Sequence, residues 1–155
     1  MLRQYTVRPV EPADLDRILE IERASFGRDS YDRNLFAEYA LKCGSLFLVC
    51  ERSFKVWGYA IACLSGRRRG DVLPEAELVS LAVDPAARRT GAAKALLRST
   101  LRRLRARRVA RLRLMVKVTN QAARTFYETF GFEKVRTVRG YYEDGQDACA
   151  MAKRL

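Results

Sequence analysis

Residues 77–94 constrain the fold more than any other part of this chain. They begin with an apolar run, 78–83, which is short and rich in branched residues, as in a buried strand. Asp84-Pro85 ends that strand, because proline lacks a ladder donor and fixes its own φ. A slim, basic segment, 88–93, follows, and then a helical pattern starts. A strand, a tight turn and a helix N-terminus together offer free N–H groups and a positive dipole to an anion.

The small side chains of this turn suit a phosphate group. Gly91 has no side chain to hold a phosphate away from the backbone, and Ala92 and Ala93 are nearly as slim. Arg88 and Lys94 flank them with positive charge. The turn taken alone is equally compatible with an ordinary strand–helix connection that carries basic side chains.

The charge of the chain favours an anionic partner. It has 30 basic and 18 acidic residues, no histidine, a net charge of +12 and a pI near 10.1. Such a field attracts phosphorylated cofactors, nucleic acid or an RNA-rich particle, although a solvated surface without a specific partner is the alternative. The length of 155 residues predicts one domain, 1–155, with a sizeable core.

The cysteines predict a reduced interior. Cys43, Cys50, Cys63 and Cys149 are widely spaced in apolar contexts, with no CxxC pair and no histidine to complete a zinc site. We therefore expect no metal, and core thiols of a cytoplasmic protein. The start of the sequence lacks an apolar signal region, and no window approaches the ~18 apolar residues of a membrane span. We expect no membrane partner; the oligomeric state is not indicated.

Periodicity and turn residues predict an α/β (α+β) chain. Apolar spacing indicates helices over 11–26, around 35–40, 92–108 and 122–127. Strand patterns occupy 4–8, 45–51, 56–64, 75–83, 109–118, 135–139 and 148–152, and a glycine- and arginine-rich loop occupies 65–71. The second and third strands form a hairpin pattern, so an antiparallel sheet is expected to give way to strand–helix units.

The helix over 92–108 carries an unusually basic exposed face. Its predicted buried stripe consists of Ala93, Leu96, Leu97, Thr100, Leu101 and Leu104. Its predicted exposed face consists of Lys94, Arg98, Arg102, Arg103, Arg105 and Arg107. Solubility explains such a face most simply, and contact with nucleic acid or a ribosome is the alternative, without interleaved aromatic residues to stack on bases.

Three segments carry motifs that occur together, in this order, in one superfamily. Residues 81–93 contain LAVDP and then R-x-x-G-x-A, residues 120–132 contain N-x-A-A-x-x-F-Y-E-x-x-G-F, and residues 140–148 read GYYEDGQDA. The first two resemble the acyl-CoA signature and the second signature of the GCN5-related N-acetyltransferases (GNAT). The third resembles the protein N-terminal acetyltransferases, namely the RimI type, which acts on a ribosomal protein, and its Ard-like relatives.

This resemblance implies a mostly antiparallel sheet, splayed at its centre and flanked by helices, with acetyl-CoA in the cleft. By the same similarity, backbone groups of Leu81, Ala82 and Val83 contact the pantetheine arm, and Asn120 touches the cofactor from the following helix. The diphosphate is expected at Arg88, Arg89, Thr90, Gly91, Ala92, Ala93 and Lys94. Backbone donors, a helix dipole and arginines suit that anion independently.

The implied reaction is direct attack of an amine on the thioester, which requires an acid and a base. Tyr127 matches the tyrosine that family members use as general acid; a packed core tyrosine is the alternative. RimI-type enzymes usually carry glutamate where this chain has Met115, and a thioether cannot accept a proton. Glu77 matches a strand glutamate that the histone-acetylating branch uses as base, and we expect it to be partly buried. Asp29 is a second, weaker candidate. The alternative for Glu77 is a simple strand-edge carboxylate, and the alternative for Asp29 is a cap of the next helix. Without a protein base, either water relays the proton to bulk or activity is weak.

The resemblance implies a protein N-terminal α-amino group as acceptor, such as that of a ribosomal protein. Its pKa of about 7.7–8.0, against about 10.4 for lysine, supplies free amine without a strong base. Tyr141 and Tyr142 resemble residues that close over a peptide N-terminus, or else form a packed aromatic pair. A small amine or a lysine side chain is the first alternative. A non-catalytic RNA- or ribosome-binding module that keeps CoA affinity is the second.

Overall fold

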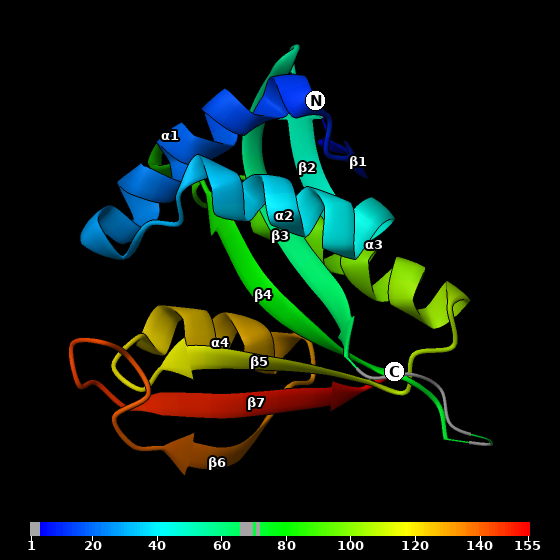
Figure 1. The fold of residues 1–155 in the computed structure, drawn as a ribbon, viewed down its shortest axis with the longest axis vertical. Helices are drawn as coiled ribbons and strands as arrows, with labels where there is room; N and C mark the ends of the chain where they lie inside the picture. The colour runs from blue at the N-terminus through cyan, green and yellow to red at the C-terminus, as the bar shows by residue number, and fades with distance from the viewer. Residues whose placement is uncertain (1–3, 66–69, 71) are drawn as a thin grey trace.

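One mixed sheet organises the molecule (Figure 1). The computed structural model describes residues 4–65, 70 and 72–155, so most of the predicted loop 65–71 lies outside the described residues. The sheet has seven strands in the order β1-β2-β3-β4-β5-β7-β6. They are β1 (Thr6–Pro9), β2 (Phe47–Arg52), β3 (Lys55–Ser65), β4 (Glu75–Val83), β5 (Arg111–Lys117), β6 (Glu133–Val138) and β7 (Ala148–Arg154).

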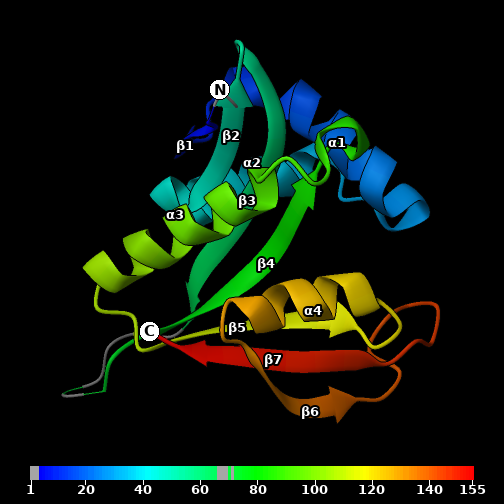
Figure 2. The same ribbon diagram turned by 180° about the vertical axis from the view of Figure 1, so that it is seen from behind.

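Helices cover both faces of the sheet (Figures 1 and 2). They are α1 (Leu15–Phe26), α2 (Arg33–Cys43), α3 (Ala92–Ala106) and α4 (Gln121–Thr129). α1 and α2 pack on one face, and α3 and α4 on the other, each above its own apolar cluster. Strand alternation supplies both clusters: in β2, Phe47 and Val49 face α1 and α2, whereas Leu48 and Cys50 face α3. No described helix is long and apolar enough to cross a lipid bilayer.

Local signals in the sequence fix where these helices begin and end. Asp32 caps α2 by accepting the Leu35 N–H at 2.9 Å, and Asn120 caps α4 in the same way. Gly44 ends α2 with a φ of +56°, a backbone angle that favours glycine. The predicted helices are therefore all present, with their ends within a few residues of those expected.

The sheet splays between its two central strands. Among the described residues every neighbouring pair of strands is antiparallel except β4 and β5, which run parallel. Their ladder joins Glu75–Glu77 to Arg111–Arg113, and beyond it the two strands diverge (Figure 1). The prediction of a mostly antiparallel, splayed sheet flanked by helices is confirmed.

A β-bulge in β4 lies beside the splay. Opposite β3, the register shifts so that Val79 is the extra residue on β4. Such a bulge changes which face the following side chains occupy. Ala76 and Leu78 pack on the α3 face before the shift, and Leu81 and Val83 pack on that face after it.

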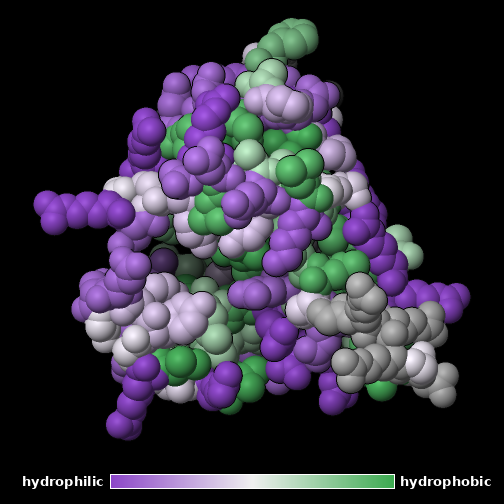
Figure 3. Space-filling model, viewed as in Figure 1, coloured by the Kyte–Doolittle hydropathy of each residue, from purple (hydrophilic) through white to green (hydrophobic). Residues whose placement is uncertain are grey.

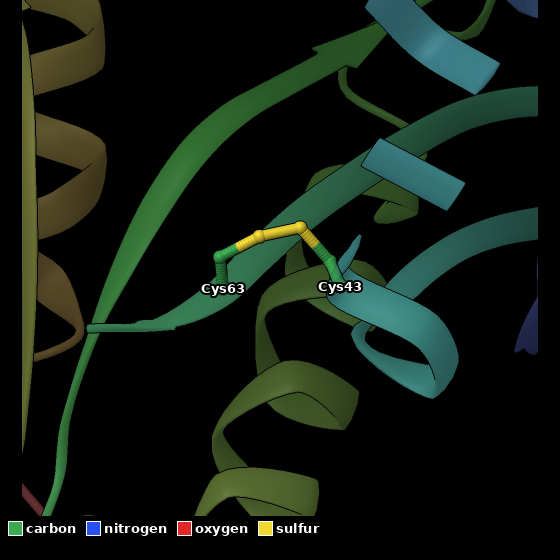
Figure 4. The surroundings of a disulfide bond; sticks show 2 residues. All are labelled: Cys43 and Cys63. Atoms are coloured by element: carbon green, nitrogen blue, oxygen red, sulfur yellow. A yellow bond between two sulfur atoms is a disulfide. The ribbon is translucent and has the colours of Figure 1, made fainter. Parts of the chain in front are cut away.

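Cys43 and Cys63 form a disulfide, which shows that the prediction of four reduced thiols was wrong (Figure 4). α2 ends at Cys43 beside β3, and the two Cα atoms lie 4.9 Å apart, a separation that a disulfide spans. Both residues are buried, as expected, but apolar context does not reveal which thiols meet after folding. Cys50 and Cys149 are free and buried, as predicted.

We expect reduction of this disulfide to destabilise the fold. A cross-link across 20 residues stabilises a protein by about 3 kcal/mol, mainly by restricting the unfolded chain. At roughly 2–4 °C per kcal/mol for a chain of this size, Tm should fall by roughly 6–12 °C. Calorimetry with and without reductant measures the shift, and a Cys43→Ser/Cys63→Ser variant, insensitive to reductant, is the control. Four titratable thiols in the unreduced, denatured protein would contradict the disulfide.

Candidate active site

A cavity of about 450 Å³ occupies the gap where β4 and β5 diverge. Its walls come from 78–81 of β4 and 114–117 of β5, together with the end of α1 and the start of α4. In Figure 3 the surface is hollowed between the part that carries α1 and α2 and the part that carries β5, β6 and β7. The gap between the diverging strands is therefore a cavity large enough for a small ligand, and side chains do not fill it.

Tyr127 lies on α4 and lines this cavity while remaining buried. Its ring packs edge-on against Phe132 at 5.6 Å and against Phe126 at 5.3 Å, so the neighbouring aromatic residues hold it in place. Burial raises the pKa of the Tyr127 hydroxyl above its usual range, and nearby Tyr142 raises it further. The hydroxyl therefore keeps its proton at neutral pH, as a general acid must.

Asn120 lines the same cavity at the N-terminus of α4. Its side-chain oxygen accepts the N–H of Ala123 at 3.1 Å, so the residue has a capping role in the helix. Capping leaves the side-chain amide nitrogen as a donor for another group. The expected contact with the cofactor stays a prediction.

A second pocket, of about 460 Å³, lies at the predicted anion-binding turn. Its lining includes 91–94, at the N-terminus of α3, with Arg88 and Arg89 beside them. Gly91 adopts a φ of +89°, and a Cβ built on it meets no atom within 4 Å. The first N–H groups of α3 have no acceptor within the helix, so this turn has the room, the donors and the charge that a diphosphate needs.

Neighbouring residues of α4 and β4 line the two pockets. Phe126 lines the pocket at the turn, and the next residue, Tyr127, lines the central cavity. Val83 of β4 also borders the turn pocket, while Leu81 borders the cavity. That one elongated ligand, anionic at one end, spans both pockets stays a proposal.

A groove of about 530 Å³ reaches the cavity from the side of α2. Four tyrosines line it: Tyr31, Tyr39, Tyr141 and Tyr142. Tyr141 and Tyr142, in the loop before β7, stack edge-on at 5.0 Å, and Tyr141 is 48% exposed. Tyr31 and Tyr142 border the cavity as well, so the groove and the cavity are continuous. A second molecule therefore has its own approach.

The structure separates the two predicted bases. Glu77 is exposed and lines the groove rather than the cavity, so the expected partial burial was wrong. Strand alternation is the reason, since Leu78 takes the buried side and leaves Glu77 on the open one. Asp29 lines the cavity, with its side chain 60% exposed and 3.7 Å from the ammonium of Lys117. Met115 borders both spaces.

Sequence reasoning missed Glu22, an acidic residue of α1 that lines the cavity and is only 1% exposed. The N–H of Tyr31 donates to its carboxylate at 3.1 Å, and the hydroxyl of Tyr59 donates to its other oxygen. Burial raises the pKa of Glu22 to about 7, although the Tyr31 N–H opposes that shift. One signal was available: Glu22 lies three and four residues after Leu19 and Ile18, on the apolar side of the helix.

Comparison with known proteins agrees with this geometry. The model of the acetyltransferase (GNAT) family matches residues 15–132. An N-alpha-acetyltransferase of Saccharolobus solfataricus is 30% identical over 99% of this chain and 95% of its own length.

Two solved structures extend the similarity to the fold. Ard1 from Thermoplasma volcanium has a TM-score of 0.90 at 26% identity, covering 97% of each chain. The ribosomal-protein-S18-alanine N-acetyltransferase from Escherichia coli has a TM-score of 0.81 at 31% identity, covering 97% of this chain and 94% of its own. With its splayed sheet and paired pockets, this chain belongs to the GNAT family and is an N-acetyltransferase that uses acetyl-CoA.

Proposed function

We propose that the protein transfers the acetyl group of acetyl-CoA to the α-amino group of protein N-termini. The observation that carries the proposal is the tyrosine-lined groove that opens into the cavity beside Tyr127, separate from the pocket at the predicted anion-binding turn. The names of the relatives support it, since they include an N-alpha-acetyltransferase and a ribosomal-protein alanine acetyltransferase.

In this proposal the turn at 88–94 holds the diphosphate of acetyl-CoA, through Arg88, Arg89 and Lys94 and through the N–H groups at Thr90, Gly91, Ala92 and Ala93. The edge of β4 at Leu81, Ala82 and Val83 lies past the last pairing with β5, so its backbone groups are available to the pantetheine amides. Asn120 adds its side-chain amide from α4.

The thioester supplies an electrophilic carbonyl carbon, and the residues of this chain manage the protons. The amine nitrogen bonds to that carbon, and the carbon–sulfur bond breaks. Tyr127 gives its hydroxyl proton to the departing sulfur and recovers a proton from the nitrogen, directly or through water. An amine that arrives as an ammonium must also lose one proton before its nitrogen can attack. The candidates predicted from the sequence to receive that proton are Glu77, Asp29 and a water relay.

The groove favours an extended peptide end as acceptor. Tyr141 and Tyr142 line it together with Met115, and in this proposal their rings pack against the entering peptide backbone. The pKa is about 7.7–8.0 for an α-amino group and about 10.4 for a lysine side chain. At pH 7 the unprotonated fraction of the α-amino group is therefore roughly several-hundred-fold larger than that of lysine. The α-amino group therefore suits this site better than a lysine side chain.

A ribosomal contact through α3 is part of the proposal. A cytoplasmic location is proposed with it because a relative is named for acting on a ribosomal protein; the Cys43–Cys63 disulfide removes the argument from reduced thiols. Lys94, Arg98, Arg102 and Arg105 line an open groove with Lys153 of β7, and no acidic side chain is among its described lining residues. Positive charges spaced three and four apart on one helix face suit a phosphate backbone. Binding to ribosomal RNA that weakens steeply as salt rises would test this contact.

The acceptor assignment predicts a clear preference in a peptide panel. With acetyl-CoA at neutral pH, we expect acetylation of free N-terminal peptides, measured by mass spectrometry, and little on matched peptides with a blocked N-terminus and a free lysine. Small amines are the third arm. Preferential acetylation of lysines or small amines would overturn the acceptor class, and RNA binding without turnover on any arm would favour a binding module.

Tyr127→Phe should lower kcat by roughly 10²–10⁴-fold, because it removes the proton given to the leaving sulfur. The affinity for acetyl-CoA, measured by calorimetry, should stay unchanged, since the ring and its packing remain. Thermal unfolding of the variant checks that the fold survives. An equal loss of turnover and of acetyl-CoA affinity would indicate a packing role instead.

Gly91→Glu should weaken acetyl-CoA binding by roughly tenfold or more, because charge repulsion adds to a strain of about 1–3 kcal/mol at positive φ. Gly91→Ala is the matched control, since its Cβ meets no atom within 4 Å and it carries the strain without the charge. Calorimetric titration of both variants separates the two effects. Equal affinities for Gly91→Glu and Gly91→Ala would refute the diphosphate assignment.

A further inference from the structure

We propose that Glu22 is the proton acceptor for the incoming amine. The inference rests on the proposed function and adds the base that Met115 cannot provide. Glu22 reaches the site from α1, a helix that none of the three family-like motifs includes.

The position of Glu22 supports this role. Its side chain lines the cavity that also contains Tyr127 and Ser80, although it is almost fully shielded from bulk water. Two donors fix the carboxylate, the Tyr31 N–H at 3.1 Å on one oxygen and the Tyr59 hydroxyl on the other. The Tyr59 hydroxyl also lies 3.2 Å from the Ser80 hydroxyl, which ties the carboxylate to β4 at the bulge. A base oriented in this way is ready to receive a proton.

The surroundings keep Glu22 basic near neutral pH. The titratable groups that share its cavity or its hydrogen bonds are Tyr31, Tyr59, Tyr127, Tyr142, Asp29 and Lys117. Lys117, the cation among them, lies 3.7 Å from Asp29 and 3.2 Å from Asp144, and no ion pair with Glu22 occurs in the described part of the chain. Burial without a cation raises the pKa to about 7, close to that of an α-amino group.

The protons balance with two groups in the cavity. The Glu22 carboxylate takes one proton from the ammonium of the acceptor, which frees the nitrogen lone pair for attack. Tyr127 protonates the sulfur as the carbon–sulfur bond breaks, and the second nitrogen proton restores its hydroxyl. Glu22 then releases its proton to solvent as the products leave. Because only ionised Glu22 is active, turnover rises with pH through the pKa of Glu22.

Glu22→Gln in the full-length protein tests the inference, with a free N-terminal peptide that the wild type acetylates. We expect kcat at pH 7 to fall by roughly 10²-fold or more. The acid limb of the wild-type profile, the decline of kcat below about pH 7 that protonation of Glu22 causes, should be absent from the pH profile of the variant. The defect should shrink with acceptor amines of lower pKa, which arrive already deprotonated. Glu20→Gln, an exposed carboxylate on the same helix, is the matched control.

A second variant removes a hydrogen bond without removing the base. Tyr59→Phe deletes a donor to the Glu22 carboxylate, so the acid limb should move to higher pH while the activity at high pH is retained. A wild-type profile in both variants would overturn the role of Glu22, as would an altered limb in Glu77→Gln or Asp29→Asn alone. Absence of turnover by the wild type on every acceptor would instead overturn the proposed function itself.

Discussion

The site depends on the early end of one parallel ladder. β4 and β5 pair over three residues each and then separate. Beyond the ladder, their backbone groups and side chains line an opening instead of pairing and packing within a continuous sheet. A buried strand edge without partners is costly in a closed core. Here the edge faces the space that a ligand can enter, and the amides of pantetheine are suitable partners for it. In the proposed function, the same opening gives the acetyl donor and the acceptor separate approaches.

The opening also distributes the proposed chemistry between the two faces of the sheet. Tyr127 comes from α4, on the face that carries α3, whereas Glu22 comes from α1, on the opposite face. The proposed acid and base therefore belong to different cores and meet only where the strands part. This arrangement keeps a neutral phenol and an ionisable carboxylate in one cavity without direct pairing, so that burial can raise the pKa of each.

Much of this architecture could be predicted from the sequence, because its signals are local. Asn120 as a cap, Gly44 as a helix end and the slim basic turn before α3 follow from short motifs and appear in the structure, while anion binding at that turn stays a prediction. What failed depends on contacts between distant segments. The pairing of Cys43 with a cysteine of β3, and the exposure of Glu77, are set by how helices and strands meet. For Glu22 the helical spacing gave a local signal for burial, but the donors that hold its carboxylate in the cavity come from β3 and from the loop before α2.

The bulge at Val79 has a consequence for how the central strand can change over time. Two alternation frames coexist in β4, one before the bulge and one after it, and Ser80 reaches the Tyr59 hydroxyl only in the second. A substitution leaves both frames of alternation in place. Deletion of one residue at the bulge removes the second frame, so that every later side chain of β4 moves to the opposite face of the sheet. The number of residues in β4, as much as their identity, is therefore a heritable property on which this site depends.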